Sequence, residues 1–291
     1  MIRIRLGLFL LALFAAGALL APWLVPVGPA DVTDVVLTRF LPPGAVDQFG
    51  IIHGLGTDRL GRDVWSRLIF GARVSLVVAL LATTVSVVVG LSVGAAAAFS
   101  KGRLATILLA ATDFALALPR VVVLLLLAAL WEPSALLVVV TLGLTGWMPV
   151  ARLVYAETLG QLGRPYLAAG QALGSSRRHL FRAHVLPNIS APLWAAATLG
   201  IGNAITLEAG LSFLGLGVQP PTPSWGTLIA SGRETVVNAP WVGLAPGIAL
   251  VLVVIACTLI ADGFEASSDQ ERHQLAGSNL EPNRTTVRSD R

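Results

Sequence analysis

Polar and charged side chains inside apolar runs are the residues of this chain best suited to a functional site. Asp113, Arg120 and Glu208 each interrupt a long apolar run, and Asn203 lies near the last of them. An ionisable group costs about 2.5–3.5 kcal/mol to place in hydrocarbon, so it usually faces a cavity, an opposite charge or another chain. We expect these four residues to be candidates for a substrate path.

Each of the four also has a simpler explanation. Asp113 can reach a nearby membrane interface, and Arg120 and Glu208 can pair with each other or with a companion subunit. Asn203 is typical of an interhelical hydrogen bond. The sequence leaves these alternatives open.

The sequence contains no catalytic constellation and no metal-ligand spacing. Its histidines are scattered over three segments, at His53, His179, His184 and His273. The single cysteine, Cys257, excludes an intramolecular disulfide. No glycine-rich run ends in Gly-Lys-Ser or Gly-Lys-Thr, so the chain lacks a P-loop. We therefore expect no catalytic residue, metal or cofactor on this chain, and any ATP must be bound by another one.

Composition indicates a polytopic membrane protein, because 55% of the 291 residues are hydrophobic and only 12% are charged. The net charge of +4 is small and no stretch mixes basic and aromatic residues, which argues against a nucleic-acid partner. The first apolar run is longer than a signal-peptide core, so an uncleaved helix is favoured over a signal peptide. Six transmembrane helices are expected, at 6–25, 74–99, 104–131, 134–155, 191–216 and 241–260.

Three further features set how these helices should be arranged. Thr57 or Asp58 can cap an amphipathic helix that lies along the outer interface before the chain enters the membrane at residue 74. Gly90 and Gly94 form a small-xxx-small pair that lets a neighbouring helix approach closely. Pro119 should interrupt the third span. The segment 217–240 is expected to be an outer loop, and 263–291 a disordered tail.

The segment 160–188, which we call the knob, is polar between two apolar runs. It is predicted to form two short helices, the second capped by Ser175 or Ser176 and ended by Pro187. A knob with a basic rim suits docking into a groove on a soluble partner, and an amphipathic loop in the headgroup layer is the alternative. The first helix should stop at Gly174. Its one apolar face is expected to consist of Tyr166, Ala169, Gly170 and Leu173.

Charge distribution predicts the orientation. With a cytoplasmic N-terminus, thirteen of the 20 lysine and arginine residues lie inside and six outside, while Arg120 lies in the membrane. This obeys the positive-inside rule. Both termini and the knob are therefore expected on the cytoplasmic side.

The knob resembles the cytoplasmic coupling loop of ABC importer permeases, whose pattern is Glu-Ala-Ala, then a glycine, then a hydrophobic residue, Leu and Pro. Ala168 stands at the position of the family's glutamate and Gly170 at that of its second alanine, so a salt bridge from that glutamate to the ATPase is absent. The resemblance implies that the following residues couple to the ATPase: Tyr166, Ala168, Ala169, Gly170, Ala172, Leu173, Gly174, Leu186, Pro187 and Asn188.

Two further motifs, GLGTDRLGRDVWSRLIFGAR at 54–73 and LSFLGLGVQPPTPSWG at 211–226, resemble permeases of the dipeptide, oligopeptide and nickel importers. The resemblance implies a type I ABC importer permease fold in the inner membrane. The expected domains are an N-terminal transmembrane helix (1–27), an extracytoplasmic segment with an interfacial helix (28–73), a five-helix core that includes the knob (74–262) and a cytoplasmic tail (263–291).

The same resemblance implies the partners: a second permease subunit forming a heterodimer, two ATPase subunits or domains that carry ATP and Mg²⁺, and an extracytoplasmic solute-binding protein. The substrate is then a di- or oligopeptide, or a small solute such as nickel. An ion-coupled secondary transporter is the competing hypothesis, but it would favour internal repeats with matching broken helices, which the two halves lack. A membrane scaffold without transport explains the intramembrane charges poorly.

Overall fold

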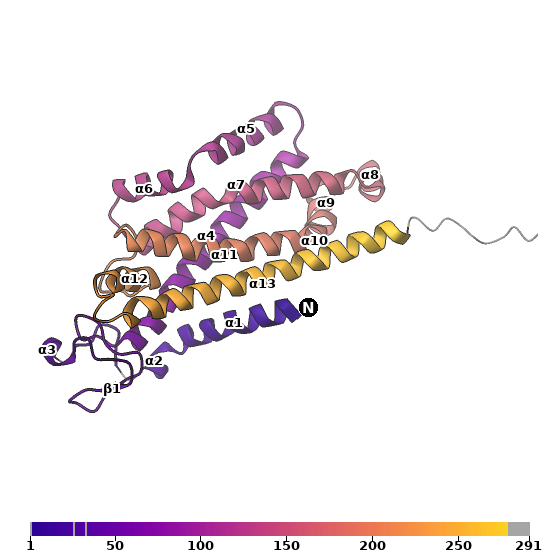
Figure 1. Cartoon of the computed structure of the whole chain (residues 1–291). Helices are drawn as coiled ribbons and strands as arrows, with labels where there is room; N and C mark the ends of the chain where they lie inside the picture. The colour runs from indigo at the N-terminus through magenta and orange to yellow at the C-terminus, as the bar shows by residue number, and fades with distance from the viewer. Residues whose placement is uncertain (1, 26, 33, 279–291) are drawn as a thin grey trace, which may run out of the picture.

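The computed structural model describes residues 2–25, 27–32 and 34–278, and most of them are helical (Figure 1). Two short antiparallel strands, β1 and β2, form the only sheet within the described residues. The elements in chain order are α1 (Ile2–Leu19), α2 (Ala21–Leu24), α3 (Val35–Thr38), β1 (Ala45–Val46), β2 (Ile52–His53), α4 (Val64–Phe99), α5 (Arg103–Ala117), α6 (Arg120–Leu130), α7 (Ala135–Leu162), α8 (Pro165–Ala172), α9 (Arg177–Leu180), a π-helical turn η1 (Phe181–Val185), α10 (Leu186–Asn188), α11 (Ser190–Phe213), α12 (Trp225–Glu234) and α13 (Trp241–Ser278).

The long helices lie side by side in one bundle, as Figure 1 shows for α1, α4, α7, α11 and α13. Among the described residues, α1, α4, α7 and the part of α13 at Trp241–Ala266 are long and apolar enough to cross a bilayer alone. Two bent pairs of helices meet the same criteria. One is α5 with α6, and the other is the second knob helix, Arg177–Asn188 (α9, η1 and α10), with α11. Counting each pair as one span gives the six predicted, and the fold is an all-α membrane bundle.

The bend between α5 and α6 is 82° and lies at the predicted proline. Leu118 is extended, with a ψ of 132°, because the ring of Pro119 disfavours helical backbone in the residue before it. Pro119 then precedes the first residue of α6, where its missing N–H costs nothing. The break directs Arg120 toward α7, as described below.

The glycine pair in α4 brings α7 close, as predicted. A Cβ at Gly90 would lie 2.6 Å from Val150 Cβ, and a Cβ at Gly94 would lie 2.4 Å from the Ala151 carbonyl oxygen. Real Cβ atoms do not approach so closely, so only glycine fits at either position. The backbone of α4 at these glycines therefore packs directly against α7, in the half of each helix that is nearer the knob.

The prediction of a separate interfacial helix in 28–73 is wrong. Helix α4 begins at Val64, not after Thr57 or Asp58, and it continues unbroken through residue 74 to Phe99. The cap is Asp63, whose carboxylate accepts a 2.6 Å hydrogen bond from the Ser66 N–H. Asp58 instead closes a tight turn by accepting hydrogen bonds from the N–H groups of residues 60 and 62.

The segment 217–240 is not wholly a loop, since it contains α12. Ser224 and Thr227 form a reciprocal capping box at its start. The Trp225 side chain is fully buried, and its indole Nε1 donates a 3.1 Å hydrogen bond to the Leu68 carbonyl of α4. Burial of this tryptophan fixes α12 against the bundle.

The predicted disordered tail is also partly wrong. Helix α13 runs to Ser278, so residues 263–278 are helical rather than disordered. Residues 279–291 lie outside the described residues. At 263, a glycine lets α1 approach α13, because a Cβ there would lie 2.1 Å from Ile4 Cγ1.

Candidate functional site

The knob, at one end of the bundle, forms the first part of the candidate site. In Figure 1 the knob helices α8 to α10 lie at the same end as the N-terminus and the last turns of α13. The short helices α2, α3 and α12 and strand β1 lie at the opposite end. We call that opposite end, made of the described residues between 27 and 63 together with α12, the collar.

The two knob helices are joined at Gly174, as predicted. Gly174 has a φ of +82°, and a Cβ there would meet no other atom within 4 Å. A glycine is therefore required by the left-handed backbone and not by lack of space. Ser175 N–H donates to the Gly170 carbonyl across this turn. Of the two possible caps, Ser176 accepts the hydrogen bond from the His179 N–H at 3.2 Å, and the second helix ends at Asn188.

Buried side chains attach the knob to the bundle. Leu167 of α8 is fully buried, and it belongs to a hydrophobic cluster with residues from α7 and the second knob helix. Phe181 packs edge to face on Phe99 at 6.1 Å, and Arg177 Nη1 donates a 2.8 Å hydrogen bond to the Phe99 carbonyl. The cluster consists of Val150, Val154, Leu167, Leu180, Val185 and Ile189.

Most of the apolar face predicted for the first knob helix is exposed, although Gly170 lies against Leu180 of the hydrophobic cluster. Tyr166 and Leu173 are 43% and 87% exposed. Leu186 is half-buried against the hydrophobic cluster, whereas Pro187 is exposed. The remaining coupling candidates are also exposed, except for the partly exposed Gly170: Ala168, Ala169, Ala172, Gly174 and Asn188. The knob therefore exposes small residues together with Tyr166 and Leu173.

The rim of the knob is basic, as predicted. Arg178 and Arg182 are exposed on the second helix, and His184 makes edge contacts with the rings of Tyr166 and His179 at 6.1 and 5.9 Å. The aromatic contacts bridge the two knob helices above the buried cluster. Together the anchors and bridges make a rigid projection.

A cavity of about 310 Å³ lies between α4, α6, α7 and α11 and forms the second part of the candidate site. Arg120 enters it from the first turn of α6. Its Nε lies 3.3 Å from Thr145 Oγ1, and its Nη2 lies 3.4 Å from the Leu142 carbonyl oxygen. The lining residues used below are Thr83, Ser86, Arg120, Gly146, Gly200 and Asn203.

Two glycines keep this cavity open. A Cβ at Gly146 would lie 2.4 Å from Ser86 Oγ and 3.2 Å from Arg120 Nη2, and one at Gly200 would lie 3.0 Å from Thr83 Cγ2. Thr83 is only 6% exposed, and its hydroxyl has no hydrogen-bond partner in the part of the chain that the structure describes. The cavity wall therefore carries one buried hydroxyl that the described part of the chain leaves unused.

The structure brings Arg120 and Asn203 to this one cavity but places the other two path candidates elsewhere. Asp113 forms an ion pair with Arg152, and both side chains are about half exposed. Glu208 is fully buried and accepts hydrogen bonds from Ser75 Oγ at 2.9 Å and Ser212 Oγ at 2.8 Å. No ion pair joins Arg120 to Glu208 among the described residues.

Glu208 instead joins three helices near the collar. Ser75 of α4 donates to Glu208 of α11 and accepts a 3.2 Å hydrogen bond from the Trp225 N–H of α12. Every polar group in this set is satisfied, which stabilises a buried carboxyl. This role could not be predicted from the sequence, because Ser75 is 133 residues away from Glu208 along the chain.

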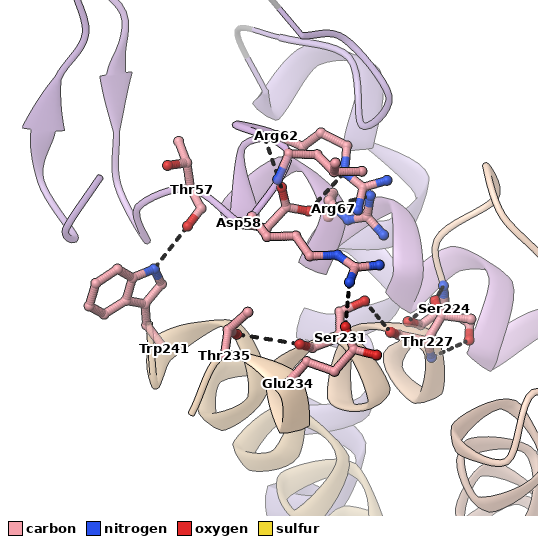
Figure 2. Close-up of polar contacts among 12 residues, drawn as sticks. Thr57, Asp58, Arg62, Arg67, Ser224, Thr227, Ser231, Glu234, Thr235 and Trp241 are labelled. Atoms are coloured by element: carbon pink, nitrogen blue, oxygen red, sulfur yellow. Dashed lines mark hydrogen bonds and ion pairs between the residues drawn. The ribbon is translucent and has the colours of Figure 1, made fainter. Parts of the chain in front are cut away.

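Figure 2 shows the collar, where Asp58 accepts from Arg62 Nε at 2.8 Å and lies 3.8 Å from Arg67 Nη1. Below it the Trp241 indole Nε1 donates to the Thr57 carbonyl at 3.3 Å, which ties the collar to the start of α13. The arginine at position 59 pairs with Glu234 of α12. These contacts hold the collar against the outer ends of α4, α12 and α13.

A buried histidine orients the carboxylate that caps α4. His53 Nδ1 lies 2.8 Å from Asp63 Oδ1, and its Nε2 lies 3.6 Å from Asp47 Oδ2. Burial raises the pKa of Asp47, but hydrogen bonds from the backbone N–H groups of Ile51 and Phe49 and the contact with His53 outweigh it and hold the pKa below its ordinary value. No cluster of three potential metal ligands occurs among the described residues.

Comparison with known proteins places these features in a family context. The profile of the family described as binding-protein-dependent transport system inner membrane component matches residues 86–273, which include the knob. The chain is 38% identical over 271 residues to the di/tripeptide transport system permease protein DppC of Pseudomonas aeruginosa, covering 93% of this chain and 88% of that protein.

Two relatives from Brucella are similar to the chain at the same level. A putative peptide transport system permease protein of Brucella suis is 38% identical over 261 residues, which cover 89% of this chain and 85% of that protein. A putative peptide permease protein of Brucella ovis is 37% identical over 265 residues, which cover 90% and 85%. The similarity in each case extends over nearly the whole chain.

Proposed function

This chain belongs to the family of binding-protein-dependent transport system inner membrane components, and we propose that it is the permease subunit of an ATP-driven importer of di- and oligopeptides. The observation that carries the proposal is the knob, a projection anchored by buried side chains whose outer face exposes Leu173 and several small residues. Such a face suits a groove on another protein. The chain is a transport subunit and not an enzyme.

The groove is assigned to an ATPase that binds ATP and Mg²⁺ on its own chain. Leu173 is the natural anchor, because an isolated, highly exposed leucine gains free energy only when a partner buries it. Two ATPase subunits or domains and a second permease subunit complete the transporter, and an extracytoplasmic solute-binding protein delivers the substrate to the collar. Both termini and the knob are assigned to the cytoplasm. The common position of the N-terminus, the knob and the last turns of α13 in Figure 1 supports this assignment, as does the positive-inside count.

Helix α4 supplies the mechanical link between the two ends. Its 36 residues extend about 54 Å at 1.5 Å per residue, from the Asp63 cap in the collar to Phe99 at the knob. Closure of the ATPases on ATP would draw the knobs together and, through Arg177 and the anchoring cluster, tilt α4 and α7. The spans would then change from inward-open to outward-open, and hydrolysis would reverse the change.

Peptides are favoured over nickel as the substrate. The three relatives compared above are named as peptide permeases. Within the described residues, the lining of the cavity carries an arginine but no histidine, cysteine or carboxylate that would ligate nickel. A positive side chain also repels a metal cation. The same lining weakens the competing hypothesis of an ion-coupled secondary transporter, because Asp113 and Glu208 do not line the cavity.

Affinity purification of the tagged chain from its native membrane in mild detergent tests the proposal. Recovery of a second permease and of ATPase subunits is expected for the wild type, and loss of the ATPases is expected for Leu173→Glu. Purification of the wild-type chain without any ATPase would contradict the proposal. Recovery of the second permease with both variants is the control that the membrane part is still assembled.

A further inference from the structure

Arg120 is a cation within an apolar run, and no described residue forms an ion pair with it. Its two hydrogen bonds are long, at 3.3 and 3.4 Å, and both acceptors are neutral oxygens. Arg62 and Arg152, by contrast, each pair with a carboxylate. Since Arg120 has no ion-pair partner among the described residues, its charge remains available to a ligand.

A buried hydroxyl without a partner among the described residues lines the same cavity as Arg120. The Thr83 hydroxyl is buried on α4 and has no partner in the described part of the chain. The Asn203 side chain borders the cavity from α11, and none of the acidic residues that the structure describes lines it. A guanidinium, a hydroxyl and an amide around one space favour a ligand that accepts several hydrogen bonds and carries negative charge, and a carboxylate matches the planar fork of an arginine best.

We propose that this cavity is a subsite for the C-terminal carboxylate of the peptide during its passage, with Arg120 as the group that binds it. The inference rests on the proposed function and adds the part of the substrate that is recognised. The C-terminal carboxylate is common to peptides of every sequence, so one arginine can serve substrates that differ in their side chains. A volume of about 310 Å³ suits one end of a peptide better than a whole oligopeptide.

Thiol labelling of the complete transporter in proteoliposomes tests the subsite. Asn203→Cys is made in a Cys257→Ser background, so that this chain carries one thiol, and labelling is read on this chain after separation of the subunits. The measured quantity is the rate of labelling by an anionic methanethiosulfonate reagent divided by the rate with a cationic one. We expect this ratio to be about fivefold higher at Asn203→Cys than for a free thiol. Arg120→Gln should abolish this preference, and Arg120→Lys should keep it.

Peptide protection identifies the ligand. Trialanine, supplied with the binding protein and ATP, should slow labelling of Asn203→Cys, whereas trialanine amide should not, and Arg120→Gln should remove the protection. Thr206→Cys is the matched control, because it lies on α11 but does not line the cavity. Its reaction rate should be independent of Arg120 and of trialanine.

An unreactive thiol, a charge preference that survives Arg120→Gln, or equal protection by trialanine and its amide would overturn the subsite. ATP-dependent uptake of trialanine by the Cys257→Ser parent is measured first. Absence of that uptake would contradict the proposed function itself. Uptake in the parent without protection at Asn203→Cys would overturn only the subsite.

Discussion

Arg177 Nη1 donates a 2.8 Å hydrogen bond to the carbonyl oxygen of Phe99, the last residue of α4. That carbonyl has no intrahelical partner because it ends the helix. The bond therefore connects the second knob helix to α4, the helix that reaches the collar. A displacement of the knob is passed to α4 through this bond and through the packing of Phe181 on Phe99.

This contact gives the first prediction. Arg177→Met should lower peptide uptake severalfold while ATP hydrolysis by the complex continues, because the knob would still dock but would move α4 less. Arg178→Met is the matched control, since Arg178 is the exposed neighbour on the same helix. Uptake and ATPase rates are measured together in proteoliposomes. An equal fall in both rates for Arg177→Met would argue against a transmission role.

Leu173 and Leu167 should respond in opposite ways to substitution. Leu173→Glu leaves the fold of the chain intact because the side chain is 87% exposed, but it should weaken ATPase docking on the order of tenfold. Leu167→Ala should instead destabilise the chain by about 2–5 kcal/mol, because it empties a fully buried site. Thermal unfolding and co-purification are the readouts. Normal ATPase recovery with Leu173→Glu would exclude Leu173 as the anchor.

Gly174 should tolerate asparagine better than leucine. A Cβ there meets no atom within 4 Å, yet a leucine must adopt a φ of +82°, at a cost of about 1–2 kcal/mol. Gly174→Leu should therefore turn the tip of the knob and uncouple ATP hydrolysis from uptake without preventing membrane insertion. Gly174→Asn should keep most of the uptake, because asparagine adopts this conformation more readily. Uptake at the wild-type level in Gly174→Leu would refute the coupling role of this turn.

Close packing of α4 on α7 should make Gly94 sensitive to a single side chain. Gly94→Val would place its Cβ 2.4 Å from the Ala151 carbonyl oxygen, so the helices must separate, at a cost of roughly 1–3 kcal/mol or more. Gly210→Ala is the control, because a Cβ there meets nothing within 4 Å. The amount of folded chain after mild heating in detergent should fall for the first variant and not for the second.

The sequence was sufficient to predict the spans, the glycine contacts and the two knob helices, because all three depend on local pattern. It was not sufficient for the start of α4. Asp58 and Asp63 are equally good caps by type, and only the turn that Asp58 makes with residues 60 and 62 decides between them. Helix α12 did have a signal, since Ser224 and Thr227 have capping-box spacing just before apolar residues, but the surrounding prolines favoured a loop.

The types of residue at the candidate site could be predicted from the sequence, but not which of them are buried or lie together. Leu167 on α8 and Leu173 just after it are the same residue type, and only the packing against α7 and the second knob helix determines which is buried. Likewise Arg120, Asn203 and Glu208 all carry polar groups within apolar runs. Only the fold separates the first two, which line one cavity, from Glu208, which is satisfied by two serines.

Peptide uptake by the purified, reconstituted transporter tests the central claim most directly. The chain is reconstituted with its second permease and ATPases, the binding protein is added outside, and uptake of labelled trialanine is measured with ATP inside, with or without a proton gradient. The account predicts uptake that requires ATP and the ATPases and is unaffected when the proton gradient is dissipated. Uptake by the permease chains alone, driven by a proton gradient in the absence of ATP, would contradict it.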